Sequence, residues 1–488
     1  MSLEEIREER VSKLNLLKEK GVNPYPVSVD RDFTLAEVIE TFDELIKKEK
    51  EISVVGRVMA VRGHGGSSFF NINDGTDTMQ CYIKKDVVDE EQFELFRKAL
   101  DIGDFIEVKG SLFVTKKEEK TIEVKSWKMI SKSLLPLPDK WHGLQDTEER
   151  FRKRYLDLLM NDEVRGRFVL RSKAISALRE FLNSNDYLEV ETPSLQPLAG
   201  GATAKPFTTH HNALDIDLHL RIAPELYLKE LLIGGLTKVY ELGKTFRNEG
   251  IDITHNPEFT ILEFYEAYSD AKKQRAFVEK LFKFVASKVL EDNIFKHDTG
   301  DIDFSKDFNV ISYGELLKEY ASIDDILEIS IEDLRLKAKE FGVKVSSHES
   351  KDKIIDNIYK KTCRPKLIQP TFIIDYPVEF SPFAKQKEED PRLIDRFQLV
   401  VGGWELVNAF SELNDPKEQE NRFLEQDKKR KAGEEEVSPS DKTYLEAMEY
   451  GIPPAGGVGI GVDRLVMLFT NTKNIREVVL FPTLRPRE

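Results

Sequence analysis

The stretch from residue 245 to residue 265, TFRNEGIDITHNPEFTILEFY, limits the possible fold of this chain more than any other feature. Two strand-like runs flank a turn that contains Asn, Gly and Pro, so the stretch predicts a β-hairpin. Because side chains alternate between the two faces of a strand, Arg247 and Glu249 share a face on the incoming arm, and Phe259 shares a face with Glu263 on the outgoing arm. One face of the predicted sheet therefore combines charge with aromatic surface.

These residue types suit a nucleotide site. A guanidinium can bind a carboxylate or a phosphate through two parallel hydrogen bonds, an aromatic ring can stack on a purine, and a carboxylate can accept from an amine. Glu263 alternates with apolar residues on a face that should be buried, which favours a functional role. The alternative is an edge hairpin that carries an Arg–Glu pair on its surface.

The composition indicates a globular protein. The chain has 488 residues, of which 40% are hydrophobic and 33% are charged, enough for two or three domains with full cores. It lacks an apolar run of about 18 residues and an apolar signal core, so we expect neither membrane insertion nor secretion, and the cytoplasm is the expected compartment. Two cysteines, Cys81 and Cys363, are too few for a zinc cage or a disulfide framework. The net charge of −15 argues against indiscriminate coating of nucleic acid, although a locally basic face can bind phosphates.

The first third of the chain predicts a small barrel. Residues 1–50 form an N-terminal helical extension, and residues 51–133 contain five short β-rich runs with one helical interruption at 89–100, which fits an OB-type barrel. Phe69 and Phe70 have opposite parity on one of these runs, so one of the two must fill the barrel core. Residues 134–163 form a linker.

Residues 164–488 predict a large α+β domain. An amphipathic helix over 164–182 opens it, and helical periods within about 271–365 predict an inserted helical subdomain. Strand-like runs follow, and the chain ends on a glycine-rich strand that leads into an apolar helix. The strand-like runs lie at 371–376, 397–401 and 404–413.

Polar side chains recur at inward-facing positions in three separate segments of this domain. They are Asn408, Phe410 and Glu412 on one strand, Glu263 and Tyr265 on another, and Glu225 in the segment RIAPELYL. If they line one pocket, the pocket is strongly acidic, and confined carboxylates are costly unless a cation or hydrogen bonds compensate them. Such a pocket predicts a positively charged ligand, and an amine fits best. The alternative is that surface lysines pair with these acids.

Four motifs in order now identify a family resemblance. FRNE with His255 and Phe259 resembles motif 2 of the class II aminoacyl-tRNA synthetases, GIGVDR ending at Arg464 resembles motif 3, and Pro193 after the long helix matches the proline of motif 1. IAPELYLK, HNPEFT, NAFSELND and the barrel in front resemble the lysyl-tRNA synthetase branch, over nearly the whole chain. One motif alone is weak evidence, but four in this order are highly specific.

The resemblance implies a fold and a reaction. The expected fold class is α+β: an antiparallel-sheet class II catalytic domain with a helical insertion, preceded by an N-terminal all-β OB-fold barrel. The implied reaction is ATP-dependent ligation of L-lysine to tRNA(Lys) through a lysyl-adenylate, with release of pyrophosphate and AMP, in a homodimer. Two alternatives stay open: an aspartyl- or asparaginyl-tRNA synthetase of the same class, and a non-catalytic RNA-binding relative.

The resemblance also implies roles around the nucleotide. Arg247 would clamp the amino-acid carboxylate and the α-phosphate, and it acts with Arg464 as a catalytic residue. Glu249 would accept from the adenine amino group, and His255 would touch the β- and γ-phosphates. Phe259 and Arg464 would hold the adenine from opposite faces.

The implied lysine site draws on separate segments. Glu412 and Tyr265 would hold the ε-ammonium, and the backbone of Gly201 would hold the α-amino group together with Glu225 and Glu263. Asn408 would help Arg247 to bind the carboxylate. Phe410 would pack on the aliphatic stem, although core packing is an equally good interpretation.

The remaining implied sites concern Mg²⁺ and the anticodon. Glu405 matches a metal-binding glutamate of the family, whereas Gln398 stands where the family usually has a second glutamate. A neutral amide can bind Mg²⁺ only through its carbonyl oxygen, so the number of ions stays open. In the barrel, Phe69, Gln80 and Glu119 match positions that contact anticodon bases, by stacking and by edge hydrogen bonds.

Overall fold

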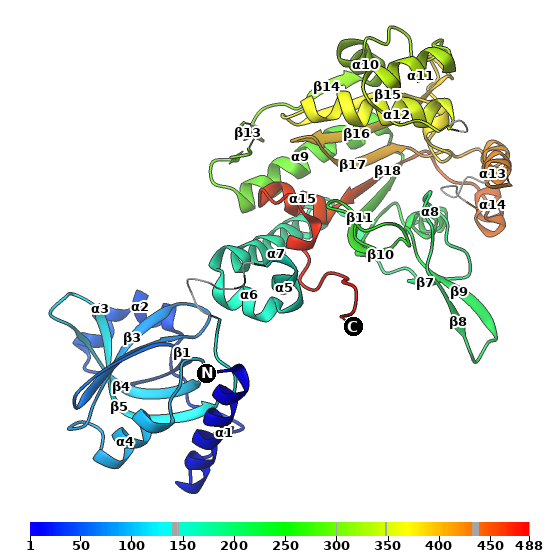
Figure 1. Ribbon diagram of the computed structural model, residues 1–488. Coiled ribbons are helices and arrows are strands. Elements are labelled where there is room, and N and C mark those ends of the chain that lie inside the picture. The colour runs from blue at the N-terminus through cyan, green and yellow to red at the C-terminus, as the bar shows by residue number, and fades with distance from the viewer. Residues whose placement is uncertain (139–143, 145, 299, 347–348, 432–438, 488) are drawn as a thin grey trace. The chain divides into compact units, whose positions relative to one another are not determined.

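The chain folds into two compact units, Met1–Leu144 and Gln145–Glu488. The computed structural model describes residues 1–138, 144, 146–298, 300–346, 349–431 and 439–487 (Figure 1). Within these ranges, no helix has the length and apolar character that crossing a membrane requires.

The first unit is a closed five-stranded barrel with strand order β1-β2-β3-β5-β4, as the sequence predicts. A helix interrupts the strands where the sequence indicated one, and further helices pack beside the barrel. The strands are β1 (Ile52–His64), β2 (Ser67–Asn73), β3 (Thr78–Lys84), β4 (Phe105–Val114) and β5 (Lys120–Ser131). The helices are α1 (Leu3–Glu19), α2 (Leu35–Glu40), α3 (Phe42–Lys47) and α4 (Glu90–Ala99).

The two adjacent phenylalanines of β2 separate as their parity requires. Phe70 lies in the barrel core and is 1% exposed, whereas Phe69 is half-buried on the outer face. The ring of Phe69 packs against Tyr82 of β3, with 4.6 Å between ring centroids. The outer face of the barrel therefore carries aromatic rings that are not part of the barrel core.

The second unit is built on an eight-stranded sheet with the order β14-β15-β16-β17-β18-β11-β10-β6. Only the outermost pairs, β14 with β15 and β10 with β6, are parallel, which confirms the expected antiparallel sheet. The strands are β6 (Leu188–Glu189), β10 (Lys238–Phe246), β11 (Glu258–Ala267), β14 (Asn309–Ser312), β15 (Thr371–Pro377), β16 (Leu393–Val401), β17 (Trp404–Ser411) and β18 (Ala455–Gly461).

Helices cover the two faces of this sheet differently. α7 (Asp162–Asn183), α9 (Ala271–Val289) and α15 (Val462–Phe469) share one apolar core with alternate strand residues such as Val407 and Ala409. The intervening residues belong to the opposite face, where Phe410 joins a core with α10 (Tyr313–Ala321), α11 (Ile331–Glu340) and α12 (Lys351–Thr362). Acidic and polar residues of β11 and β17 also lie on this second face.

The helices predicted within about 271–365 are present. α9 packs on the central sheet and against α7, β14 extends that sheet, and α10 to α12 share a core with it. These helices therefore cover the sheet, and α10 to α12 also pack against one another. The remaining elements are α5 (Thr147–Arg152), α6 (Arg154–Met160), β7 (Leu195–Gln196), β8 (Thr208–His211), β9 (Ile216–Leu220), α8 (Glu225–Ile233), β12 (Ile294–Phe295), β13 (Ile302–Asp303), α13 (Pro416–Lys431) and α14 (Lys442–Glu449).

The hairpin that opened the sequence argument consists of β10 and β11. Its incoming arm ends at Phe246, so Arg247 and Glu249, which were predicted to share a strand face, lie one and three residues beyond the strand. The Arg247 amide still donates to the Pro257 carbonyl at 2.8 Å, which extends the pairing by one residue. Glu249 lies in the exposed loop, because the turn residues that follow Phe246 break the ladder.

Candidate active site

A cleft of about 530 Å³ opens on the second face of the sheet, above β11, β17 and β18. Every residue predicted for the nucleotide, lysine and metal sites except Glu412 lines it. These lining residues are Gly201, Glu225, Arg247, Glu249, His255, Phe259, Glu263, Tyr265, Gln398, Glu405, Asn408, Phe410 and Arg464. Segments that lie far apart in the sequence therefore meet in one cavity.

Arg247 has no carboxylate at ion-pair distance among the described residues, although Glu249, Glu263 and Glu405 act on its charge from further away. Its guanidinium lies over the ring of Phe259, 5.1 Å from the ring centroid, and within the described part of the chain its buried Nε has no hydrogen-bond partner. Burial lowers the pKa of Arg247, although Glu249 and Glu263 act in the opposite direction. A guanidinium with free donors in a cleft is suited to a carboxylate or a phosphate.

The motif 2 and motif 3 side chains meet at the outer part of the cleft. Arg464 Nη2 lies 3.3 Å from Nε2 of His255, whose Nδ1 lies 2.9 Å from an Asp252 oxygen. If Arg464 donates to Nε2, the proton of His255 lies on Nδ1 and points at Asp252. Arg464 Nη1 also donates to the Glu405 carbonyl at 3.4 Å. These contacts orient Arg464 toward the cleft.

Asp463 fixes the start of α15 beneath Arg464. It is 2% exposed, and its carboxylate accepts from Arg171 of α7 at 2.6 Å and from the Thr260 amide of β11 at 2.7 Å. Because these partners come from two other elements, Asp463 sets the register of motif 3 against motif 2. No local sequence pattern singles out Asp463, because its partners lie on other elements.

The carboxylates of Glu225, Glu263 and Glu412 gather at the closed end of the cleft. Lys229 lies between those of Glu225 and Glu412. Lys229 of α8, 1% exposed, lies 2.6 Å from Glu225 Oε1 and 2.5 Å from Glu412 Oε2. Burial works against its charge, but the two carboxylates outweigh burial and raise the pKa of Lys229. The predicted acidic pocket exists, and it contains an internal cation that the sequence argument missed.

Glu263 is buried without a lysine or arginine at ion-pair distance among the described residues. It accepts a hydrogen bond from the Tyr265 hydroxyl at 3.1 Å. Burial, together with repulsion from Glu225, raises the pKa of Glu263 to about 8. Burial also raises the pKa of Glu412 to about 8, against the attraction of Lys229. Near neutral pH the ligand-free site therefore holds protons that a bound cation can displace.

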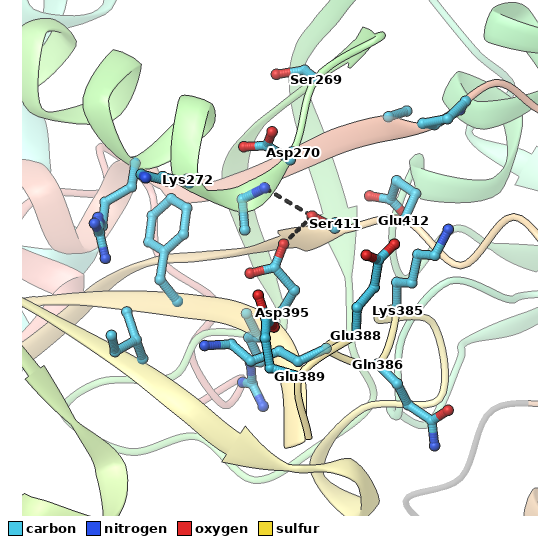
Figure 2. A pocket seen from close by; sticks show the side chains of 18 residues that line it. Ser269, Asp270, Lys272, Lys385, Gln386, Glu388, Glu389, Asp395, Ser411 and Glu412 are labelled. Carbon is cyan, nitrogen blue, oxygen red and sulfur yellow. Dashed lines mark hydrogen bonds between the residues drawn. The ribbon is translucent and has the colours of Figure 1, made fainter. Parts of the chain in front are cut away.

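Glu412 occupies a position that differs from the prediction. It lines a neighbouring pocket of about 510 Å³ with Ser411 and Lys385, which Figure 2 shows, instead of the main cleft. Its backbone lies just past the end of β17, and its carboxylate is almost completely buried. A Cβ placed on Gly457 would collide with Glu412 Oε1 and with the Tyr265 ring, so Glu412 Oε1 lies over Gly457 and beside Tyr265, on the face of the sheet that carries the cleft.

The end of β17 is held by a serine in that neighbouring pocket. The Ser411 hydroxyl accepts from the Ala271 amide at 2.8 Å and donates to Asp395, as the dashed lines in Figure 2 show. The contact ties β17 to the start of α9. It fixes the backbone from which Glu412 projects.

Asn408 and Gln398 are each oriented by one partner. Arg396 donates to Asn408 Oδ1 at 2.8 Å, so the Asn408 amino group is left to face the cleft as a donor. Tyr376 donates to Gln398 Oε1 at 2.7 Å. The one oxygen through which Gln398 could bind Mg²⁺ therefore already accepts a hydrogen bond, whereas Glu405 lines the cleft as a carboxylate.

The outer face of the barrel gathers the other predicted residues. Phe69, Tyr82 and Phe113 form a row of rings, with 4.6 Å and 6.1 Å between successive centroids. Gln80 lies on the same face and donates to Thr121 Oγ1 at 2.8 Å. Glu119 is exposed in the turn that precedes β5. The structure places Phe69 and Gln80 on one outer face of the barrel. The rings of Tyr82 and Phe113, which were not predicted as site residues, lie on the same face.

Of the missed residues, Lys229 had a usable signal. It follows Glu225 by four positions in a helix, a spacing that places the two side chains on one face. Arg396 and Asp463 had no such signal, because their partners lie on other strands and helices.

Comparisons with known proteins agree with this geometry. Residues 146–485 match the family of class II tRNA synthetases (D, K and N), and residues 52–130 match the OB-fold nucleic acid binding domain. A lysine–tRNA ligase of Pelotomaculum thermopropionicum is 48% identical over 100% of this chain and 96% of its own. Those of Moorella thermoacetica and Carboxydothermus hydrogenoformans are each 47% identical and cover 98% and 100% of this chain, and 97% and 99% of their own. The chain therefore belongs to the class II tRNA synthetases of the D, K and N group and, within it, to the lysine–tRNA ligase family.

Proposed function

We propose that this protein ligates L-lysine to tRNA(Lys) at the expense of ATP, through a lysyl-adenylate. The observation that carries the proposal is a pair of opposite vacancies on the cleft face of the sheet: among the described residues, Arg247 has no carboxylate at ion-pair distance and Glu412 Oε1 has no hydrogen-bond donor. An amino acid with a carboxylate at one end and an ammonium at the other satisfies both. Aspartate would place a second carboxylate beside buried acids.

The first step needs no side-chain base. The lysine carboxylate is already ionised near pH 7 and attacks the α-phosphate in line, which expels pyrophosphate. Arg247 positions the carboxylate and balances the negative charge that develops on the α-phosphate, and Arg464 holds the adenine from the face opposite Phe259. In the second step a terminal hydroxyl of the tRNA attacks the carbonyl carbon of the lysyl-adenylate, so the lysyl group is transferred to the tRNA and AMP leaves.

The amino-acid roles follow from the contacts. Tyr265 and Glu412 hold the ε-ammonium, and Glu225 and Glu263 hold the α-ammonium with the backbone of Gly201. Gly201 has φ +83°, and a Cβ there would lie 2.9 Å from Glu225 Cβ, so only glycine permits this approach. Asn408 donates to the carboxylate, and Phe410 lines the cleft beside the stem.

The residues present fit a Mg²⁺ ion that arrives with the nucleotide. Mg²⁺ binds one or two carboxylates together with phosphate oxygens, and Glu405 supplies such a carboxylate in the cleft. Gln398 could contribute only the oxygen that already accepts from Tyr376. When bound, the ion would neutralise phosphate charge, and Glu405 would hold it near Arg464.

Amino-acid-dependent exchange of pyrophosphate into ATP tests the function. We expect exchange with lysine and only background exchange with aspartate or asparagine. Exchange with aspartate or asparagine in place of lysine would favour the sister synthetases of this class. Absence of adenylate formation in the presence of Mg²⁺ with every amino acid would favour the non-catalytic relative.

Lysine recognition should depend on pH. Because the pKa values of Glu263 and Glu412 are both raised to about 8, the ligand-free site must lose protons before both carboxylates can bind ammonium groups. We expect the KM for lysine in the exchange assay to fall by about tenfold for each proton released as the pH rises from about 6.5 to about 8.5. The KM for ATP, measured in the same series, should change less.

The raised pKa values of Glu263 and Glu412 have the opposite effect on the stability of the lysine-free protein, which they lower as the pH rises. A carboxyl group whose pKa is higher in the folded than in the unfolded protein stabilises the fold while it is protonated. This stabilisation is complete at a pH below the pKa of the unfolded state, and it is lost as the pH rises through the pKa of the folded state, here about 8. The Tm of the lysine-free protein should therefore fall across this range, while the Tm gain on adding lysine should grow. A lysine KM that rises with pH would contradict these assignments.

The barrel is proposed to bind the anticodon through Phe69, Gln80 and Glu119. Stacking on an aromatic side chain contributes about 1–3 kcal/mol per base, so Phe69→Ala should weaken tRNA binding by about tenfold or more. The lysine-dependent exchange reaction should be unchanged. Filter binding with tRNA(Lys) and the exchange assay measure the two effects.

The control for this variant is Val114→Ala, which removes an exposed apolar side chain at the end of β4. It should leave both assays unchanged. A loss of exchange activity in Phe69→Ala comparable to its loss of tRNA binding would contradict the division of labour between barrel and catalytic unit.

We also propose a homodimer formed through the motif 1 region near Pro193. β6 is an edge strand of the sheet, and apolar side chains around it are exposed: Val169 51%, Leu188 51%, Leu195 46% and Leu198 37%. Exposed apolar residues beside an unpaired edge are typical of an association surface. Sedimentation equilibrium should give twice the mass of one chain, and a monomer at micromolar concentration would contradict the proposal.

A further inference from the structure

Lys229 is an unusual residue for the wall of a cation-binding pocket. It lies on α8, one helical turn after Glu225, and its ammonium is enclosed by the Glu225 and Glu412 carboxylates. The rings of Phe383 and Phe410 lie on its other sides, with Nζ 4.9 Å and 5.4 Å from their centroids. A cation bound this completely cannot serve as a surface charge.

The two oxygens of Glu412 have different surroundings. Nζ of Lys229 lies 2.5 Å from Oε2, and both oxygens are buried without a hydrogen-bond partner of good geometry within the described ranges. Oε1 lies over Gly457 and beside the Tyr265 ring, two residues that line the cleft. Glu412 is therefore ion-paired with an internal ammonium through Oε2, and its Oε1 is placed to accept from an ammonium in the cleft.

Lys229 also offsets part of the negative charge at the closed end of the site. When Glu225, Glu263 and Glu412 are all ionised they carry three negative charges, and Lys229 lies at ion-pair distance from two of them. Without Lys229 the site would carry a further uncompensated negative charge in a buried environment. Such a charge is expensive, and the usual response is that a carboxylate takes up a proton.

We propose that Lys229 is a positioning residue for lysine recognition, which favours the ionised form of the Glu225 and Glu412 carboxylates beside it and fixes Glu412 where its Oε1 can accept from the ligand's distal ammonium. It touches neither ATP nor the reacting carboxylate and acts through its two partners. The inference rests on the proposed function, because it assumes that the distal ammonium of the substrate binds at Glu412.

The test is Lys229→Met, which keeps the length of the side chain and removes its charge. In lysine-dependent exchange at about pH 7, the KM for lysine should rise by about tenfold or more, and the KM for ATP should change by less than about threefold. The loss should shrink at about pH 8.5, because higher pH removes the protons that the carboxylates gain when Lys229 is absent. Lys229→Arg should restore the pH profile of the unmodified protein.

The matched control is Lys283→Met. Lys283 pairs with Glu279 and Asp307 on the surface of the same unit, at 2.7 Å and 3.2 Å, and its side chain is 30% exposed. This variant should leave both KM values and the pH profile unchanged. An unchanged lysine KM in Lys229→Met, or a loss that is equal at both pH values, would overturn the proposal.

If Lys229→Met fails to fold, the double variant Lys229→Met/Glu412→Gln decides the question. The double variant removes the charges of Lys229 and of Glu412 and keeps side chains of similar volume. If circular dichroism shows that the double variant is folded, the result supports charge compensation. Failure of the double variant as well would show that Lys229 acts by packing. Failure of the proposed function is distinguishable, because the unmodified protein itself would then show no lysine-dependent exchange.

Discussion

Arg247→Ala should lower the rate of lysine-dependent pyrophosphate exchange by about 10²- to 10³-fold, the effect of removing one preorganised donor from a developing negative charge. The reason is geometric: the guanidinium lies over Phe259 with its Nε unsatisfied, so an incoming anion is its natural partner. Most of the loss should appear in kcat, because Arg247 supports the charge that forms on the α-phosphate. Arg247→Lys should recover little activity, since an ammonium cannot reproduce the bidentate fork.

The control for this variant is Arg392→Ala. Arg392 is exposed and binds Asp390 at 2.8 Å on the surface of the same unit, so its loss should leave exchange unchanged. Thermal unfolding should show that Arg247→Ala remains folded. A folded Arg247→Ala protein with exchange activity within about threefold of the original would exclude the proposed role.

Glu412→Gln should weaken lysine binding by about 2–5 kcal/mol, which corresponds to a factor of about 30 or more, while ATP binding stays nearly intact. The substitution removes the charged partner of a desolvated ammonium and leaves that ammonium with a neutral amide. Isothermal titration with lysine and with a non-hydrolysable ATP analogue measures the two affinities separately.

Glu388→Gln is the matched control for this second variant. Glu388 lines the same neighbouring pocket as Glu412, as Figure 2 shows, but its side chain is exposed. Its loss should change neither affinity. If Glu412→Gln bound lysine as tightly as the original protein, the assignment of the ε-ammonium site would be wrong.

Local sequence patterns predicted the elements and the face on which each side chain lies. Strand alternation predicted that one of Phe69 and Phe70 fills the barrel core, and the structure has Phe70 there; alternation also placed Glu263, Tyr265, Asn408 and Phe410 on one face each of their strands, the cleft face. The pattern failed where a strand ended, as at Phe246, because alternation applies only while the backbone stays extended. The helices at 271–365 were recognised, but their place as covering layers depends on the sheet they bury.

The sequence by itself determined which residue types this protein brings to lysine, ATP and tRNA, because motif order and parity are properties of neighbouring positions. Only the tertiary structure decided which charges meet. Lys229 pairs with Glu412 across 183 positions of chain, Asp463 joins α7 to β11, and Glu412 Oε1 lies over Gly457 beside Tyr265. These contacts depend on the register of β17 and β18 and on the packing of α8, and no local pattern fixes how two distant segments align.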